Sequence, residues 1–226
     1  MRYKAILLDI DNTLYDYNIT HAFAKNRVVE YCMAELSLSK DDINAAYETA
    51  RKQIHIELTE TAASHNRLLY FQRMSEILGV NPMKYGFEIY NTYWDSFLEV
   101  IKPFDGIYEL LEKYKNQICL VTDLTAHIQY RKIKKLGLEK YCDKLVTSEE
   151  AGHEKPHPYM FIMALQKLGL QPNEVCMIGD SYKKDVFGAT NLGMAAIWFN
   201  HENKQENYND KLINEVKSFK QIIELL

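Results

Sequence analysis

The chain has 226 residues, a length that suits one domain, or one core domain that carries a second module. Apolar residues make up 47% and charged residues 26%, so a sizeable core can be buried. The 31 acidic and 27 basic residues give a net charge of -4, and no basic excess indicates a nucleic-acid-binding or membrane surface.

The beginning of the chain shows no pattern typical of a signal peptide or a membrane span. The first apolar run covers residues 5–8 before Asp9 ends it, and no later run approaches the roughly 20 apolar residues that a spanning helix needs. The four cysteines, at positions 32, 119, 142 and 176, match no zinc-binding pattern. Two of them, Cys119 and Cys176, lie inside apolar runs and are expected to be buried thiols, which suits a cytoplasmic protein.

The first predicted strand, residues 3–10, precedes a long stretch of helical periodicity without a clear strand. The helices predicted in this stretch span residues 20–36, 39–57, 65–78 and 83–100. Ser39 provides an N-cap signal, and Gly79 follows the third helix as a stop signal. We therefore expect an all-helical insertion over residues 17–100, between two pieces of a core at 1–16 and 101–226.

After the insertion, short apolar runs alternate with helical patterns. Strands are predicted at residues 118–122, 144–147, 175–178 and 195–199. Helices are predicted at residues 105–115, 125–136, 158–168, 183–192 and, last, 211–226. Strands that alternate with helices imply right-handed crossovers and a parallel sheet, so the predicted fold class is α/β.

Polar side chains that can take part in catalysis or metal binding lie where the predicted strands end. Asp9 and Asp11 lie at the carboxyl end of the first predicted strand and point to the same side of an extended chain. Thr122 and Asp123 close the second strand. Because ligands bind beyond the carboxyl ends of open parallel sheets, these side chains mark the candidate site.

Three further residues complete this set: Lys155 precedes the fourth strand, and Asp180 and Asp185 follow it. Carboxylates, a hydroxyl and a lysine are what phosphoryl transfer requires, as magnesium ligands, nucleophile and partners of the phosphoryl oxygens. Each signal alone has a commoner structural interpretation, such as a turn for Asp-x-Asp or a solvated loop lysine for Lys155. Their occurrence in order, each at the end or in the loop of a predicted parallel strand, favours the catalytic interpretation.

These motifs resemble those of the haloacid dehalogenase superfamily of hydrolases, in the group that carries the C1 helical cap. The matching residues are Asp9, Asp11 and Thr13 in the first motif, Thr122 in the second, Lys155 in the third, and Gly179, Asp180 and Asp185 in the fourth. The resemblance covers almost the whole chain. It implies a Rossmann-like core of three α/β/α layers, with residues 17–100 as the cap.

The resemblance also implies catalytic roles. Asp9 would be the nucleophile that forms an aspartyl-phosphate, and Asp11 would protonate the leaving oxygen and then activate water. Thr122 and Lys155 would hold the phosphoryl oxygens. The dehalogenases proper lack a carboxylate at the position of Asp11, because a halide leaves without a proton, so Asp11 favours phosphate esters.

The implied cofactor is Mg²⁺. Its implied ligands are Asp9, Asp11 through its backbone carbonyl, and Asp180, while Asp185 would support the metal site or orient Lys155. Manganese shares the same hard oxygen chemistry and is not distinguished from magnesium by these residues.

For the substrate, we expect contacts with Thr122, Asp123 and Lys155 in the core. Arg67 is the candidate in the cap, because arginine recognises carboxylate or phosphate, although an exposed helix-surface arginine is the alternative. The cap is rich in aromatic residues, most of which we expect in its packing core, while one or two are candidates for stacking on a nucleobase or sugar.

Together these features predict a Mg²⁺-dependent phosphomonoester hydrolase. Its expected partner is a small-molecule phosphate ester, such as a nucleoside 5′-monophosphate or a sugar phosphate, with no nucleic acid and no membrane, in a monomer or homodimer. Two alternatives stay open: phosphoryl transfer of the phosphoglucomutase type, and a non-catalytic binding module. Net phosphate release distinguishes a hydrolase from a mutase.

Overall fold

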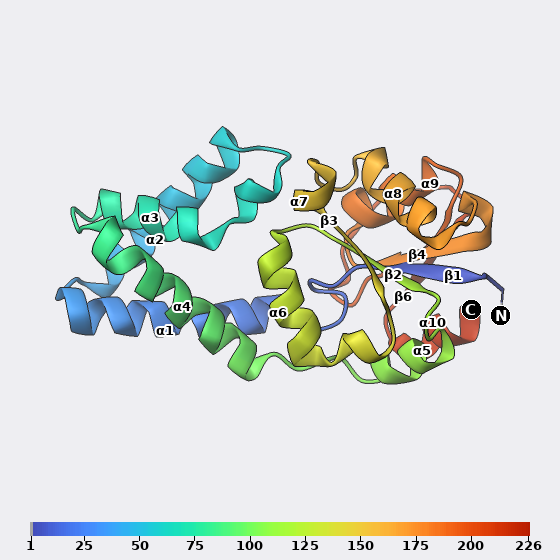
Figure 1. The fold of residues 1–226 in the computed structure, drawn as a ribbon, viewed down its shortest axis with the longest axis horizontal. Helices are drawn as coiled ribbons and strands as arrows, with labels where there is room; N and C mark the ends of the chain where they lie inside the picture. Colours follow the sequence, from blue (N-terminus) through green and yellow to red (C-terminus); the bar gives the residue numbers. More distant parts are fainter. Residues whose placement is uncertain (1) are drawn as a thin grey trace. The chain divides into compact units, whose positions relative to one another are not determined.

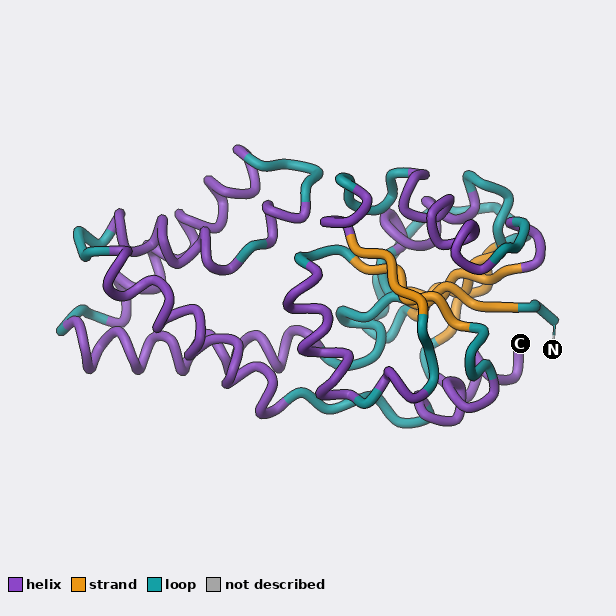
Figure 2. Tube along the Cα trace, in the orientation of Figure 1, coloured by secondary structure: helices purple, strands orange, loops and turns teal. Residues whose placement is uncertain are grey.

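A computed structural model describes residues 2–226 of the protein as two compact units. The core unit comprises residues 2–16 together with Lys102–Leu226, and the helical unit comprises Tyr17–Ile101. All strands belong to the core unit, while the helical unit contains helices and loops (Figure 2). No helix within residues 2–226 is both long and apolar enough to cross a membrane.

The core unit is built on a six-stranded parallel sheet with the strand order β3-β2-β1-β4-β5-β6. The strands are β1 (Ala5–Leu8), β2 (Ile118–Thr122), β3 (Lys144–Thr147), β4 (Val175–Gly179), β5 (Ala195–Phe199) and β6 (Ile213–Val216). Every residue of β1, β2, β4 and β5 is buried, which explains why these strands are continuous apolar runs rather than alternating patterns.

Helices cover both faces of this sheet. They are α5 (Ile107–Lys113), α6 (Ala126–Leu136), α7 (Ser148–Ala151), α8 (Pro158–Leu168), α9 (Phe187–Thr190) and α10 (Phe219–Leu225). Figure 1 shows α8 and α9 on one face and α5 and α10 on the other. The predicted α/β class with a three-layer parallel-sheet core is therefore confirmed. The two ends of the core unit meet, since the Arg2 backbone nitrogen donates to the carbonyl of Leu226 over 2.8 Å.

The end of the chain departs from the sequence-based expectation. The predicted helix at 211–226 is confirmed only in its second half, as the short helix α10. Its first half is wrong, because this part contains β6, and Ser218 is the N-cap between the two elements. β6 pairs in parallel with β5, with Ile213 beside Ala196. The open edge of β5 supplies hydrogen-bond partners that no local pattern records, and this tertiary pairing overrides helical periodicity.

A second departure lies after β4. The predicted helix at 183–192 is divided into a π-helical turn, Tyr182–Val186, and the α-helical turn α9. Ser181 begins this segment, and its hydroxyl accepts a hydrogen bond from the backbone nitrogen of Lys184 over 3.3 Å. π-helical turns are rare and concentrate at functional sites, and this one carries Asp185.

The helical unit consists of α1 (Tyr17–Leu36), α2 (Lys40–Glu57), α3 (Arg67–Ile77) and α4 (Pro82–Val100), with a 3₁₀ turn at Ala62–His65. Side-chain caps begin three of these helices: Ser39, Asn66 and Asn81 each accept a backbone hydrogen bond from the first turn. The largest fully buried side chains of this unit are aromatic, namely Tyr70, Phe71, Tyr93, Trp94 and Phe97. Most cap aromatics therefore serve packing, as the sequence indicated.

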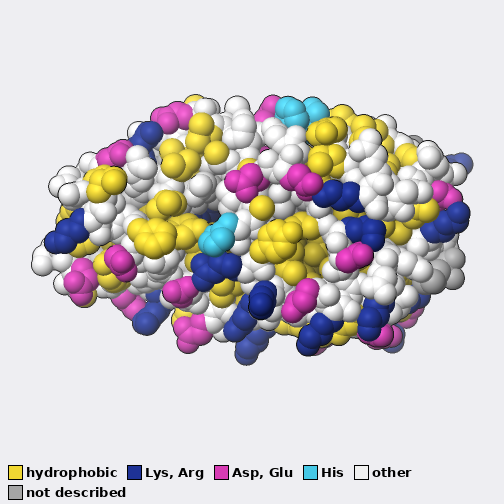
Figure 3. Space-filling model, viewed as in Figure 1, with side chains coloured by type: hydrophobic (Ala, Val, Ile, Leu, Met, Phe, Trp, Pro, Cys, Tyr) yellow, Lys and Arg dark blue, Asp and Glu magenta, His cyan; other side chains and the backbone are white. Residues whose placement is uncertain are grey.

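Basic and acidic side chains are interspersed on the molecular face drawn in Figure 3. This mixture agrees with the small net charge of -4.

Candidate active site

The candidate site begins where β1 ends. Asp9 follows β1 directly and is 5% exposed, and its backbone nitrogen continues the ladder to the carbonyl of Ile178 over 3.0 Å. One of its carboxylate oxygens, Oδ1, accepts a hydrogen bond from Lys155 Nζ over 2.6 Å. The other, Oδ2, accepts one from the Thr13 hydroxyl over 2.9 Å. The carboxylate is thereby held at the carboxyl edge of the sheet.

Asp180 occupies the corresponding position at the end of β4. The Thr13 hydroxyl accepts a hydrogen bond from the Asp180 backbone nitrogen over 3.0 Å, and Asn12 Nδ2 donates to Asp180 Oδ2 over 2.8 Å. On the other side, Trp198 Nε1 donates to the Asp180 carbonyl over 2.9 Å. The loop after β1 and the neighbouring strand β5 thus hold Asp180 from both directions.

Lys155 is the central cation of the site. Its side chain is 3% exposed, and Nζ donates to Asp9 and Asp185, each over 2.6 Å, and to the Val121 carbonyl over 2.9 Å. Burial alone would lower the pKa of Lys155, but the Asp185 and Asp9 carboxylates raise it above its ordinary value. The lysine therefore remains protonated between two aspartates.

Asp185 reaches Lys155 because Gly179 leaves space for it. A Cβ atom at position 179 would lie 2.3 Å from Asp185 Oδ2 and 2.6 Å from Asp185 Cβ. The other carboxylate oxygen of Asp185, Oδ2, accepts a hydrogen bond from the Ser181 backbone nitrogen over 3.0 Å. The glycine of the fourth motif thus has a steric role, which is to admit the carboxylate that supports Lys155.

Three buried carboxylates converge at this edge of the sheet. One ligand oxygen each from Asp9, Asp180 and Asp185 lies within 4.8 Å of the others. Burial raises the pKa of Asp9 to about 7, with Lys155 opposing the rise and Asp185 adding to it, and burial also raises the pKa of Asp180 and Asp185. Hard oxygen donors with this crowding fit Mg²⁺ or Mn²⁺, because a divalent cation relieves the repulsion between them.

Asp11 is arranged differently from Asp9, and its side chain is 24% exposed. Lys132 Nζ donates to Asp11 Oδ1 over 2.5 Å, Gln129 Nε2 donates to Oδ2 over 2.8 Å, and the Tyr15 hydroxyl also donates to Oδ1. Burial raises the pKa of Asp11, but the charge of Lys132 and these three hydrogen bonds outweigh burial, and the net effect lowers the pKa.

Sequence reasoning did not identify Lys132 and Gln129. One signal was available: position 132 falls on the buried stripe of α6 between Ile128 and Leu136, four residues from each. A lysine on an apolar stripe needs a buried partner, and its partner here is Asp11.

The two residues at the end of β2 are both engaged by neighbours. Thr122 is fully buried, and its hydroxyl accepts a hydrogen bond from Gln129 Nε2 over 2.8 Å. Asp123 accepts hydrogen bonds from Lys184 Nζ over 2.7 Å and from the Lys155 backbone nitrogen over 2.9 Å. Asp123 therefore fixes the loop that carries Lys155, and this contact suggests a structural contribution beside the expected substrate contact.

Arg67 belongs to the helical unit and begins α3. It is 5% exposed, so the alternative of an exposed surface arginine is wrong. Its guanidinium donates to the His65 carbonyl over 3.0 Å and to the Tyr17 hydroxyl, and it lies 4.8 Å from the ring centroid of Tyr70. Among the described residues 2–226, its buried Nε has no hydrogen-bond partner.

Known proteins match this chain over most of its length. Residues 6–199 match the family described as haloacid dehalogenase-like hydrolase. The chain is 35% identical over 201 residues to ribulose-1,5-bisphosphate 5-phosphatase from Halopiger xanaduensis, covering 86% of this chain and 84% of that protein. It is 29% identical over 198 residues to glyceraldehyde 3-phosphate phosphatase from Methanopyrus kandleri, covering 86% and 82%.

The fold is also found among solved structures. The magnesium-bound crystal structure of the HAD-hydrolase YfnB from Bacillus subtilis aligns with a TM-score of 0.73 at 21% identity, covering 100% of this chain and 99% of that chain. At this level of identity the likeness concerns the fold.

Proposed function

Since the chain belongs to the haloacid dehalogenase-like hydrolase family, we propose that it is a phosphatase that hydrolyses small phosphorylated metabolites with the help of Mg²⁺. The observation that carries the proposal is the buried arrangement of Asp9, Lys155 and Asp185 beside Asp180. A nucleophilic carboxylate, a cation and a set of hard oxygen ligands meet at the carboxyl edge of one sheet.

In the first half of the proposed reaction, an oxygen of Asp9 attacks the phosphorus atom. The bond from Asp9 to phosphorus forms while the bond from phosphorus to the ester oxygen breaks, and Asp11 gives a proton to that oxygen. Because Lys132 lowers the pKa of Asp11, this step draws on the fraction of the protein in which Asp11 is protonated. Lys155, with Thr122, holds the phosphoryl oxygens through positive charge and hydrogen bonding. Asp185 keeps the Lys155 ammonium oriented through the 2.6 Å contact between them.

In the second half, water attacks the phosphorus of the aspartyl-phosphate. Asp11, now a carboxylate, accepts the proton of the water as the bond from phosphorus to Asp9 breaks, and inorganic phosphate leaves. Asp9 and Asp180, with the backbone carbonyl of Asp11, would hold Mg²⁺, and Asp185 would support them. When bound there, the cation would supply positive charge beside the phosphoryl group.

The carboxylate at position 11 favours phosphate esters over halides, because only the former require a proton on the leaving group. Both relatives named above act, by their names, on phosphorylated sugars or trioses. We therefore place a sugar phosphate first among the substrates and a nucleoside 5′-monophosphate second. In the helical unit, the buried guanidinium of Arg67, whose Nε has no hydrogen-bond partner in residues 2–226, is our candidate for recognising an anionic group of the substrate.

The test is phosphate release from a panel of sugar monophosphates, sugar bisphosphates and nucleoside 5′-monophosphates, with Mg²⁺ and with excess chelator. We expect Mg²⁺-dependent release that prefers a sugar phosphate, and a loss of at least about 10³-fold in the Asp9→Asn variant, because the nucleophile is removed. Full activity of this variant would rule out Asp9 as the nucleophile.

The panel also addresses the alternatives. Transfer of the phosphoryl group to another position of the sugar without net phosphate release would indicate a mutase. No turnover of any compound with either Mg²⁺ or Mn²⁺ would favour a non-catalytic binding module.

A further inference from the structure

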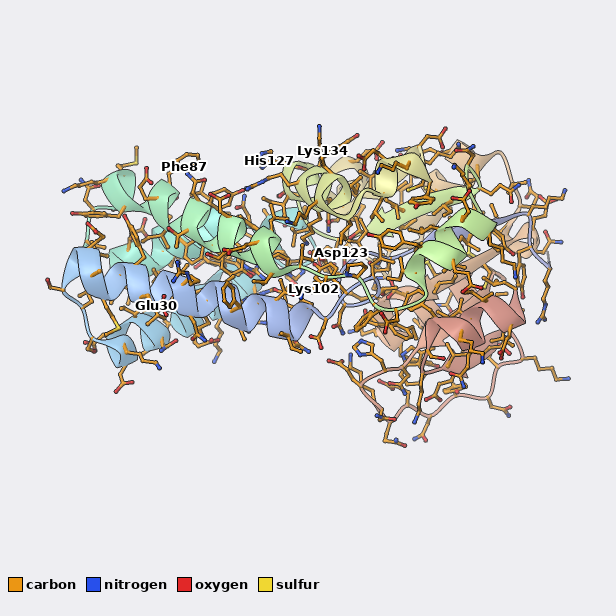
Figure 4. The ribbon with its side chains drawn as sticks, turned by 90° about the horizontal axis from the view of Figure 1, so that it is seen from below. Glu30, Phe87, Lys102, Asp123, His127 and Lys134 are labelled. Atoms are coloured by element: carbon orange, nitrogen blue, oxygen red, sulfur yellow. The ribbon has the colours of Figure 1, made fainter. Side chains whose placement is uncertain are left out.

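Helix α6 carries two polar side chains that are fully buried, Gln129 and Lys132. They are three positions apart, so they lie on the same face of the helix. Burying an ammonium and an amide is unfavourable unless each is hydrogen-bonded, and here both are directed to one carboxylate. By contrast, Lys134 on the same helix projects outward from it (Figure 4).

The side chains of Lys132 and Gln129 donate hydrogen bonds to the two carboxylate oxygens of Asp11. Lys132 Nζ lies 2.5 Å from Oδ1, and Gln129 Nε2 lies 2.8 Å from Oδ2. The Tyr15 hydroxyl adds a second hydrogen bond to Oδ1. A carboxylate bonded on both oxygens by groups from one rigid helix has a defined position and little rotational freedom.

Gln129 also connects Asp11 to the end of β2. Its Nε2 lies 2.8 Å from the Thr122 hydroxyl and 2.8 Å from the Asp123 carbonyl. Its Oε1 is buried without a hydrogen-bond partner, which costs free energy that an apolar side chain of similar size would avoid. Buried polar atoms left in this state need an explanation, and the contact with Asp11 provides one.

We propose that Lys132 and Gln129 are positioning residues that act through Asp11, setting where its carboxylate meets the leaving oxygen and the attacking water. This inference rests on the proposed function. Neither residue gains or loses a proton in it: Asp11 gives a proton to the ester oxygen in the first half and accepts one from water in the second. Misplacement of a general acid by about 1 Å can cost 10²-fold in rate.

The test compares two leaving groups in the full-length protein. p-Nitrophenolate leaves without a proton, whereas an alkoxide such as that of glycerol 3-phosphate needs one. For Lys132→Met, we expect kcat with glycerol 3-phosphate to fall about 10- to 100-fold, with KM changed less than about threefold. The pre-steady-state burst of p-nitrophenolate, which reports the first half alone, is expected to change less than about threefold.

Three further variants separate positioning from folding. Gln129→Met removes the second contact without changing charge and is expected to show the same dependence on the leaving group. Lys132→Arg, which keeps a cationic donor, is expected to restore part of the alkyl phosphate activity. Lys134→Met, on the outer side of α6, is the matched control and should behave as the wild type with both substrates.

Equal losses with both leaving groups in Lys132→Met and in Gln129→Met would assign these residues to packing and overturn the inference, while leaving the proposed function in place. Unchanged kinetics in both variants would overturn it as well. Absence of wild-type turnover would overturn the proposed function and the inference together.

Discussion

The absence of a side chain at Gly179 leaves space for Asp185, which holds Lys155. A Cβ atom at position 179 would lie 2.4 Å from Asp185 Cγ, which is closer than non-bonded carbon atoms approach. Asp185 is held between Lys155 and the backbone nitrogen of Ser181, so it has no room to retreat without losing one of them. The position of Lys155 therefore depends on a residue that contributes no functional group.

From this contact we expect Gly179→Ala to reduce phosphate release by about 10²-fold, because Asp185 and then Lys155 are displaced. We also expect it to destabilise the protein by about 1–3 kcal/mol through overpacking. Steady-state kinetics and urea unfolding measure the two effects.

The matched control is Gly86→Ala. Gly86 lies within α4, and a Cβ atom there would meet no heavy atom within 4 Å. This variant should keep full activity and gain about 0.5–1 kcal/mol in unfolding free energy, because alanine favours the helix. A fully active and stable Gly179→Ala protein would show that Asp185 is not needed where the structure places it.

At the scale of elements, strand β5 supports the candidate site through its hydrogen bond to Asp180. Trp198 is 1% exposed and packs in the hydrophobic core of the core unit. Its Nε1 donates to the Asp180 carbonyl over 2.9 Å. Because β5 pairs with β4, this hydrogen bond crosses from one strand to the end of the next, where Asp180 begins the site. The sheet thus fixes a candidate metal ligand through a neighbouring strand.

We therefore expect Trp198→Phe to weaken Mg²⁺ affinity about 10-fold, because groups that orient metal ligands typically contribute at this level. Titration calorimetry with Mg²⁺ measures the change. Trp94→Phe, which also removes a buried tryptophan but in the helical unit, should leave the Mg²⁺ affinity unchanged. If both variants bind Mg²⁺ as the wild type does, the hydrogen bond from β5 has no part in holding Asp180.

At the scale of the whole molecule, the candidate metal site couples stability to pH. In the absence of metal, burial raises the pKa of Asp9 from 3.8 to about 7, so the folded protein holds a proton that the unfolded chain releases. The folded state binds more protons between these two values, and the contribution of this group to stability therefore falls as pH rises through about 7. A bound cation would replace this proton as the positive charge beside the Asp9 carboxylate.

Accordingly, Mg²⁺ should raise the melting temperature more at pH 8 than at pH 6, because protons compete with the cation at the lower pH. Thermal unfolding with Mg²⁺ and with chelator at the two pH values provides the comparison. Asp180→Asn should remove most of the increment at pH 8. An equal increment at both pH values would mean that Asp9 does not exchange a proton for the metal in this range.

Much of the molecule was determined by the sequence alone. The alternation of strands and helices predicted the α/β class. Four motifs at the ends or loops of these strands predicted the hydrolase family, because such residues gather at one edge of a parallel sheet. Five of the strands were predicted, and four of these are continuous apolar runs because they are buried on both faces of the sheet. The residue roles drawn from the same motifs stay predictions until the variants are measured.

Tertiary structure alone decided the rest. The segment at 213–216 became a strand because the edge of β5 offered it partners, and Arg67 became buried because tyrosines of its own unit surround it. The contacts of Lys132 and Gln129 with Asp11 join residues more than 100 positions apart in the chain. Periodicity in the sequence indicates which face of a helix is buried. The partner of a buried charge depends on which distant segment packs against that face, and so does the free-energy cost of burying the charge.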